Sequence, residues 1–175
     1  MPHNSTDRPS AWVERWATQI PAGGRILDIA CGGGRHARWF AARGYVVDAV
    51  DRDAAAIASL AHVPGVHALC ADIEIGRWPY RPQTYAAVIV TNYLHRPLFP
   101  DLLTALIDGG VLIYETFALG NERYGRPSNP QFLLKPGELL DVVRGHLRVV
   151  AYEDIYSDDP KPALLQRICA VKCRP

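Results

Sequence analysis

Short apolar runs recur along the chain, and stretches with a helical spacing of apolar residues separate most of them. Many of the runs are rich in branched side chains, which suit the pleated surface of a sheet, so they predict strands. We expect strands at 25–30, 45–51, 67–73, 85–91 and 111–117, and helices at 35–43, 53–60, 100–108 and 136–144. Asp53 is expected to cap the second helix, and Gly109 with Gly110 to end the third. Pro136 is expected in the first turn of the last helix.

The order of these elements predicts the fold class. Strands that are apolar almost throughout, and that alternate with helices, indicate a parallel sheet covered on both faces. The two last strand-like runs, 147–156 and 165–172, are joined by the polar segment 157–162 without a helix, so they are expected to pair antiparallel. The expected fold is therefore α/β, with a doubly wound, mostly parallel sheet that ends in an antiparallel hairpin.

Composition narrows the classes of function. A chain of 175 residues with 49% apolar and 21% charged residues predicts one globular domain over 1–175. A net charge of +1 gives no support for nucleic-acid binding, and no apolar run approaches the roughly 20 residues that cross a bilayer. The four cysteines form no Cys-x-x-Cys pair, which predicts a reducing cytoplasm and no metal site. Nothing in the sequence indicates an oligomeric state.

Polar residues gather where the predicted parallel strands end, which is the edge at which open α/β sheets bind ligands. These ends carry 28–34, Asp51 with Arg52, Asp72 with Ile73, 92–96, and Glu115 with Thr116. Gly32 and Gly34 permit a tight turn and close approach of a ligand to the backbone, although a plain strand-to-helix turn would use them as well. Their spacing, with Asp51 downstream, also fits the dinucleotide fingerprint. An NAD(P)-dependent oxidoreductase therefore stays an alternative at this point.

A family resemblance rests on two of these segments. Residues 27–36 (LDIACGGGRH) and 47–51 (VDAVD) resemble the first two motifs of the class I S-adenosylmethionine-dependent methyltransferases, closest to the small tellurite-resistance and thiopurine type. Residues 71–73 (ADI) resemble the adenine-contacting motif of that superfamily, and the terminal hairpin matches its seven-stranded sheet. Ala30 departs from the commonest pattern, which has a glycine there. The resemblance implies methyl transfer from S-adenosyl-L-methionine to a small-molecule acceptor, with S-adenosyl-L-homocysteine as product.

The resemblance also implies the cofactor site. The candidate cofactor residues are Asp28, Ala30, Gly32, Gly34, Asp51, Arg52, Asp72, Ile73 and Asn92. Asp28 would order the loop and meet the ammonium group, directly or through water, and Asp51 would accept both ribose hydroxyls. Asp72 would meet the adenine amino group with Ile73 against the ring, and Asn92 would lie beside the sulfur. For Asp51 and Asp72 the alternative is a helix cap or a turn acid.

The N-terminal segment, residues 1–20, is expected to form a helix with two functions open. Trp12 and Trp16 resemble the paired tryptophans with which thiopurine-type enzymes cover the cofactor. An aromatic pair at this spacing equally suits a helix face that docks on the core. A non-catalytic cofactor-binding module also remains an alternative, because a fold does not fix an activity.

Candidate residues for the transfer step follow the fourth and fifth strands. His95 is the candidate base for an oxygen or nitrogen nucleophile, whereas a thiolate would need none, and a surface histidine is the alternative. Tyr93 and Glu115 are further catalytic candidates. Residues 116–135 form a connection of a length that is usually functional, expected to border the acceptor. Within it, Tyr124, Arg126 and Phe132 would supply an aromatic wall and a cation for an acidic acceptor, unless the loop is purely structural.

Overall fold

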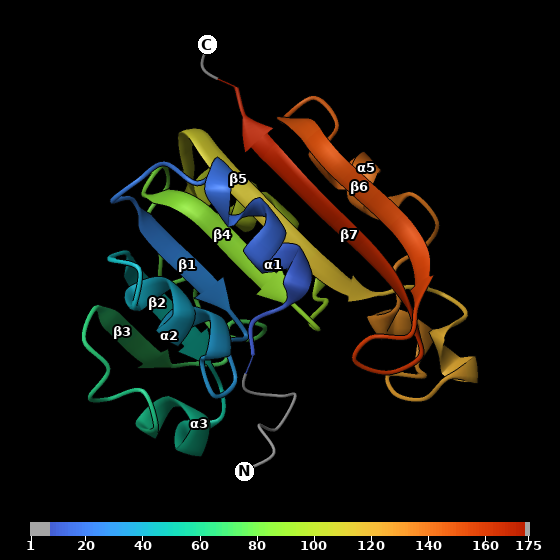
Figure 1. Cartoon of the computed structure of the whole chain (residues 1–175), viewed down its shortest axis with the longest axis horizontal. Helices are drawn as coiled ribbons and strands as arrows, with labels where there is room; N and C mark the ends of the chain where they lie inside the picture. Colours follow the sequence, from blue (N-terminus) through green and yellow to red (C-terminus); the bar gives the residue numbers. More distant parts are fainter. Residues whose placement is uncertain (1–7, 174–175) are drawn as a thin grey trace.

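The computed structural model describes residues 8–173 and shows one mixed sheet of seven strands in the order β3-β2-β1-β4-β5-β7-β6 (Figure 1). The strands are β1 (Arg25–Ile29), β2 (Val46–Asp51), β3 (Val66–Cys70), β4 (Tyr85–Thr91), β5 (Leu106–Phe117), β6 (Leu147–Ser157) and β7 (Ala163–Lys172). The first five pair parallel, and β7 pairs antiparallel with both β5 and β6. The expected sheet with its terminal antiparallel hairpin is confirmed.

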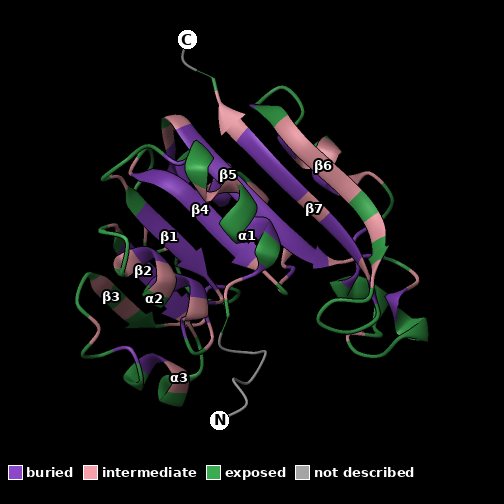
Figure 2. Ribbon diagram, in the orientation of Figure 1, coloured by how far each residue is buried: buried purple, intermediate pink, exposed green. Residues whose placement is uncertain are grey.

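Helices cover both faces of this sheet. They are α1 (Ala11–Trp16), α2 (Arg35–Ala41), α3 (Ala54–Ala58), α4 (Phe99–Ala105) and α5 (Glu138–Val143), with 3-10 turns η1 (Ala17–Gln19), η2 (Arg96–Leu98), η3 (Asn121–Arg123) and η4 (Pro130–Phe132). One apolar cluster lies under α1, α2 and α3 and includes Trp12 and Phe40, and the other lies under α4 and α5 and includes Leu102 and Leu139. Figure 2 shows the central strands buried between these two layers. Because both faces are covered, β4 is apolar along its length.

Asp53 caps α3 as expected, and two other helix boundaries differ from expectation. The Asp53 carboxylate accepts hydrogen bonds from the N–H groups of Ala55 and Ala56, at 2.9 and 3.1 Å. Gly109 and Gly110 do not end α4, which stops at Ala105 and passes straight into β5. Pro136 lies before α5, which begins at Glu138 after Gly137.

Strand β5 needs a glycine at position 110 for a reason other than the helix end that the sequence predicted. A Cβ atom on Gly110 would lie 2.8 Å from the Ile107 carbonyl oxygen and 2.9 Å from that of Tyr85. The ladder between β4 and β5 is irregular at this point, between Tyr85 and Ala87. The glycine therefore permits a close approach of two backbones rather than the end of a helix.

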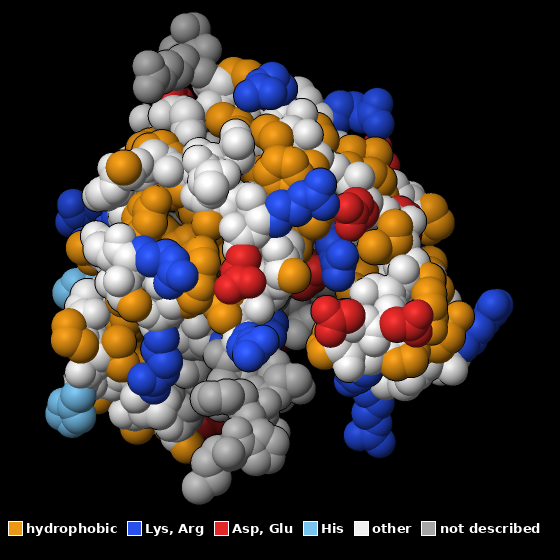
Figure 3. All heavy atoms as spheres, in the orientation of Figure 1, with side chains coloured by type: hydrophobic (Ala, Val, Ile, Leu, Met, Phe, Trp, Pro, Cys, Tyr) orange, Lys and Arg blue, Asp and Glu red, His pale blue; other side chains and the backbone are white. Residues whose placement is uncertain are grey.

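The parallel register brings the carboxyl ends of β1, β2, β4 and β5 to one edge, and the chain leaves β3 at the same edge. Beside this edge, the connection 116–135 is structured: η3 and η4 lie within it, and Ala118 forms a parallel bridge with Leu134. Within residues 8–173 no helix has the length and apolar character needed to cross a bilayer. Lys and Arg side chains are spread over the face drawn in Figure 3, with Asp and Glu between some of them.

Candidate functional site

Two cavities open at the carboxyl edge of the sheet. The strand-end cavity, about 330 Å³, is lined by Ala30, Val50, Asp51, Arg52, Ala71, Asp72, Ile73, Glu74, Asn92, Tyr93, Leu94, Thr116, Phe117, Pro127 and Phe132. The glycine-loop cavity, about 690 Å³, is lined by Cys31, Gly32, Gly33, Arg35, His36, Arg38, Ser59, Thr91 and Asn92. Asn92 lines both, so the two cavities meet at the end of β4.

The turn after β1 has the geometry of a loop that a ligand approaches closely. Ala30, Gly32 and Gly34 all have positive φ, at 50°, 52° and 74°. For Ala30 this conformation is uncommon, and strained residues of this kind cluster at ligand sites. Gly34 has a packing reason as well, because a Cβ there would lie 2.5 Å from the Leu60 side chain. The predicted close-approach turn is therefore present.

Asp51 ties this turn to the end of β2. Its carboxylate accepts hydrogen bonds from the Gly32 N–H at 2.8 Å and from the Asp53 N–H at 2.9 Å, one on each oxygen. Each carboxylate oxygen has a second lone pair. The side chain therefore keeps the capacity to accept two hydroxyl groups while it holds the loop.

Asp28 and His36 lie buried beneath the glycine turn. Asp28 accepts a hydrogen bond from the Ala37 N–H at 3.1 Å, and burial raises its pKa to about 7. Burial, assisted by the nearby Arg35, lowers the pKa of His36 to about 3, so its imidazole is neutral. The neutral ring accepts a hydrogen bond from the Ser10 N–H at 3.0 Å. Asp28 itself lines neither cavity and supports the turn from below.

The connection after β3 forms the far wall of the strand-end cavity. Asp72 accepts a hydrogen bond from the Glu74 N–H at 2.9 Å, and its other oxygen lies 3.9 Å from the Arg52 guanidinium. Ile73 is buried beside it. Sequence reasoning singled out Asp72, Ile73 and Arg52 but missed Glu74, although Glu74 follows them directly.

Three catalytic candidates from the sequence have different surroundings. Tyr93 lines the strand-end cavity, and its hydroxyl is buried without a hydrogen-bond partner among residues 8–173. Burial and the nearby Glu74 carboxylate raise the pKa of Tyr93 above its ordinary value. His95 does not line this cavity: its Nδ1 lies 3.7 Å from the carboxylate of Glu74, which does. His95 is thus a neighbour of the cavity wall rather than part of it.

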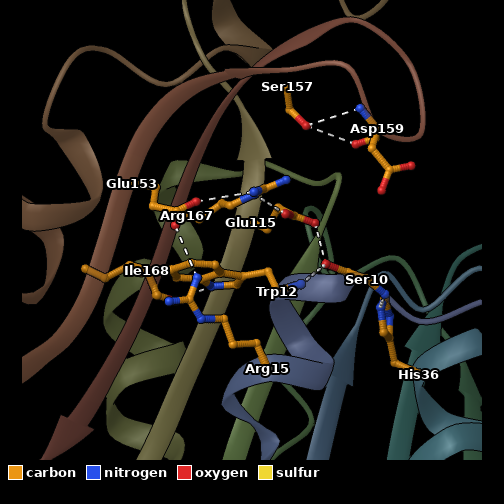
Figure 4. Close-up of polar contacts among 10 residues, drawn as sticks. All are labelled: Ser10, Trp12, Arg15, His36, Glu115, Glu153, Ser157, Asp159, Arg167 and Ile168. Atoms are coloured by element: carbon orange, nitrogen blue, oxygen red, sulfur yellow. Dashed lines mark hydrogen bonds and ion pairs between the residues drawn. The ribbon is translucent and has the colours of Figure 1, made fainter.

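Glu115 lies on the other face of the sheet, under α1. Its carboxylate accepts a hydrogen bond from the Ser10 hydroxyl at 2.7 Å and pairs with Arg167 (Figure 4). Successive side chains of a strand point to opposite faces, so Thr116, not Glu115, lines the cavity. The expectation of an acid beneath the acceptor pocket is not met by Glu115.

The N-terminal helix docks on the sheet. Trp12 is buried, and its indole N–H donates to the Ile168 carbonyl oxygen of β7 at 3.3 Å. Trp12 and Trp16 pack edge to face, with ring centroids 5.6 Å apart. Neither lines the strand-end cavity or the glycine-loop cavity, so the core alternative describes this pair in the structure, and the expected cofactor contact does not follow from it.

The connection 116–135 contributes part of the cavity wall. Pro127 and Phe132 line the strand-end cavity, whereas Tyr124 packs against Tyr156 with centroids 5.2 Å apart. Arg126 is exposed and lies outside the lining, so the expected cation for an acidic acceptor is not in the wall. Among residues 8–173, no group of three or more His, Cys, Asp or Glu side chains is arranged to hold a metal ion.

Comparison with known proteins connects this geometry to a family. Residues 26–108 match the family described as Methyltransferase domain. A search of curated protein sequences gives no match.

Solved structures share the fold at low sequence identity. TehB from Haemophilus influenzae has a TM-score of 0.75 at 18% identity, covering 94% of this chain and 62% of TehB. An S-adenosylmethionine-dependent methyltransferase from Mesorhizobium loti has a TM-score of 0.72 at 15% identity, covering 93% and 99%. The glycopeptide N-methyltransferase MtfA, complexed with S-adenosylhomocysteine, has a TM-score of 0.64 at 18% identity, covering 98% and 91%.

The family match and the shared fold agree with each other. Residues 26–108 match a methyltransferase domain, and the chain as a whole has the Rossmann-like class I fold of solved S-adenosylmethionine-dependent methyltransferases. The family match supports methyltransferase activity, and MtfA is a protein of this fold that binds S-adenosylhomocysteine.

Proposed function

We propose that this protein transfers the methyl group of S-adenosylmethionine to a small-molecule acceptor with an uncharged, apolar body. The observation that carries the proposal is the meeting of the two cavities at Asn92, one beside the glycine turn and one beside the strand ends. A donor that spans both cavities would place its reactive centre near their junction. The residues of each part suit a different portion of that donor.

The adenosine portion fits the strand-end cavity. Asp51 keeps free lone pairs for the ribose hydroxyls, and Asp72 with Ile73 offers an acceptor and an apolar surface to adenine. The methionyl portion fits the glycine-loop cavity, where Arg35 offers a cation to its carboxylate. Site-directed variants of Asp28, Asp51 and Asp72 can test the proposed cofactor roles of these residues.

The acceptor is proposed to enter opposite the adenosine portion. The charged residues of the strand-end cavity all come from the end of β2 and the connection after β3: Asp51, Arg52, Asp72 and Glu74. The opposite wall consists of Thr116, Phe117, Pro127 and Phe132 and carries no charge. An apolar wall without a fixed cation favours an uncharged acceptor over the acidic one that the sequence suggested.

The donor, when bound, supplies a methyl group on a cationic sulfur, whose charge disappears as the group is transferred. The chain's own contribution is to align the acceptor and exclude water with the apolar wall. A thiolate acceptor would need no base. For a hydroxyl or amine, the Glu74 carboxylate of the cavity lining would accept the proton, and His95, whose Nδ1 lies 3.7 Å from it, would act through it.

Calorimetric titration with S-adenosylhomocysteine and with NAD tests the donor site. We expect S-adenosylhomocysteine to bind and NAD not to bind. Asp51→Ala should weaken the binding by about 2–3 kcal/mol, because it removes charge-assisted hydrogen bonds. Asp53→Ala, two residues on, is the matched control, since it removes only the cap of α3. Binding of NAD, or equal affinity in both variants, would contradict the proposal.

A turnover assay tests transfer itself. The protein is incubated with S-adenosylmethionine and one of thiophenol, phenol, aniline or benzoate, and S-adenosylhomocysteine is measured. Release with thiophenol, phenol or aniline and not with benzoate is the expected result. Donor binding with no release across a wider acceptor panel would favour a non-catalytic module.

We also propose a cytoplasmic location, because Cys31, Cys70, Cys169 and Cys173 are all free thiols.

A further inference from the structure

Arg96 makes an unusually complete set of hydrogen bonds for a residue just past the end of β4. Its Nε donates to Glu138 Oε1 at 2.6 Å, and its Nη2 donates to Glu138 Oε2 at 2.9 Å. Its Nη1 donates to the Gln131 carbonyl oxygen at 2.7 Å, and Nη2 also reaches the Leu133 carbonyl oxygen at 2.9 Å. One guanidinium therefore binds three separate points of the connection between β5 and β6.

The two carbonyl groups that Arg96 binds flank Phe132. Phe132 lies at the end of η4, and its ring lines the strand-end cavity although half of its surface is exposed, at 48%. Arg96 thus holds the backbone on both sides of an apolar wall residue. A planar fork with several fixed donors suits this task better than a single ammonium group would.

Glu138 completes the contact. Its side chain is 16% exposed, and besides Arg96 it accepts a hydrogen bond from the Lys135 N–H at 2.8 Å. Burial alone would raise the pKa of Glu138, but the hydrogen bonds from Arg96 and Lys135 outweigh it and lower the pKa. The carboxylate is therefore ionised at neutral pH and holds both Arg96 and the chain before α5.

The neighbouring part of the connection has anchors of its own. Leu133 and Leu134 are fully buried, and the Leu134 N–H donates to the Phe117 carbonyl oxygen of β5 at 2.9 Å. Among residues 8–173, the N–H groups of Phe132 and Leu133 donate within the turn, to the carbonyl oxygens of Asn129 and Pro130. The residues just before Leu134 are therefore the part whose position depends on Arg96.

We propose that Arg96 is a positioning residue that fixes segment 131–133, and with it Phe132, in the acceptor wall of the strand-end cavity. Asn92, Tyr93 and Leu94, which precede Arg96 on the connection after β4, also line that cavity. This connection therefore contributes to the cavity directly and, through Arg96, holds a residue of the apolar wall. A wall held in place before the acceptor arrives lowers the cost of ordering it on binding. The inference rests on the proposed function only for the identity of what this wall contacts.

Hydrogen exchange on the full chain tests the positioning without any acceptor. Arg96→Gln should speed exchange of the Phe132 and Leu133 amides by about 10-fold or more, since two charge-assisted bonds to their turn are lost. The Leu134 amide, bonded to β5, should exchange as in the wild type. Arg96→Lys, which keeps the charge but loses the fork, should fall between the two.

Arg144→Gln is the matched control, because Arg144 pairs with Asp141 on the same helix α5 at 2.8 Å and both side chains are exposed. It should leave all three amides unchanged. Faster exchange over the whole sheet in Arg96→Gln would overturn the proposal in favour of a general stabilising role. Unchanged exchange at Phe132 and Leu133 would overturn it as well.

The catalytic readout uses a probe from the turnover assay. Arg96→Gln should raise the KM for thiophenol by about 10-fold, with kcat and the KM for S-adenosylmethionine within about 3-fold of wild type. Loss of donor affinity instead would overturn the assignment to the acceptor wall. Failure of the wild type to bind S-adenosylhomocysteine would refute the proposed function alone, because the exchange experiment still decides the role of Arg96.

Discussion

Asp28 is a buried carboxyl group directly under the turn that is proposed to hold the donor. It is 1% exposed, and burial raises its pKa to about 7, against the lowering influence of the Ala37 N–H and Arg35. A pKa above the unfolded value of 3.8 means that the unliganded fold loses stability as the pH rises from about 4 to about 7. A cation bound nearby would favour the ionised form.

We therefore expect S-adenosylmethionine binding to release a proton below pH 7 and to strengthen as the pH rises from about 5 to about 7. The physical reason is that the ammonium group of the donor lowers the pKa of Asp28. Calorimetry at pH 6 in buffers of different ionisation enthalpy measures the proton count. Asp28→Asn should abolish the release, and Asp48→Asn, at the other edge of the sheet, should keep it. Proton-neutral binding by the wild type would separate Asp28 from the donor.

Whether a single site residue could be predicted from the sequence depends on what determines where its side chain points. The ends of parallel strands meet at one edge, so Asp51, Asp72 and Asn92 were found from the sequence pattern, and all three line the cavities. Glu115 was misassigned because β5 is buried on both faces. A strand without a polar face gives no signal for which of two neighbouring side chains faces the site.

At the scale of elements, the sequence predicts what local chemistry decides. The Asp53 cap and the terminal hairpin were predictable from a carboxylate before a helix and from a short polar connection. The structure of the connection 116–135 was not predictable, because contacts with residues distant in sequence hold it in place. Arg96 reaches Gln131 and Leu133, and the Asn121 amide bonds the Pro127 carbonyl and the Leu164 N–H. No periodicity in the connection itself reports such partners.

Ser10 anchors the start of helix α1. The Ser10 hydroxyl accepts a hydrogen bond from the Trp12 N–H at 3.1 Å and donates to Glu115 at 2.7 Å, while the Ser10 N–H donates to His36 at 3.0 Å (Figure 4). The side chain therefore both caps the helix and joins it to β5. The backbone contact to His36 also joins it to α2.

Ser10→Ala should lower the free energy of unfolding by about 1–2 kcal/mol, because the cap is lost and Glu115 loses a donor. Urea denaturation gives the measurement, with a lower midpoint and an unchanged slope. Glu14→Ala, an exposed change in the same helix, is the control and should have little effect. Equal midpoints for the two variants would show that packing of Trp12, rather than the cap, holds α1.

The proposed binding site and a second buried polar cluster lie at opposite ends of the strands. Asp48 accepts two hydrogen bonds from Arg25, at 2.7 and 2.6 Å, and one from the Tyr85 hydroxyl at 2.6 Å. Arg25 and Tyr85 are the first residues of β1 and β4, whereas the cavities lie where these strands end. This separation makes stability and donor binding independently testable.

Asp48→Asn should lower the free energy of unfolding by roughly 2 kcal/mol at pH 7. This loss is smaller than that for breaking a fully buried ion pair, because the Arg25 side chain is 43% exposed. Burial acts to raise the pKa of Asp48, but the hydrogen bonds from Arg25 and Tyr85 outweigh it and the net pKa is lowered. The stabilisation is therefore present above the unfolded value of 3.8 and is lost as the pH falls through the lower folded pKa.

Urea denaturation of the wild type and Asp48→Asn between pH 7 and pH 3 measures this directly. The difference in unfolding free energy should be constant down to about pH 5 and shrink below about pH 4, since protonation removes from the wild type the charge that the variant lacks. Asp108→Asn, at an exposed acid, is the matched control and should show little difference at any pH. Affinity for S-adenosylhomocysteine should be the same in all three proteins. A loss of affinity in Asp48→Asn would mean that the amino edge of β2 and the site at its carboxyl end are coupled through the strand.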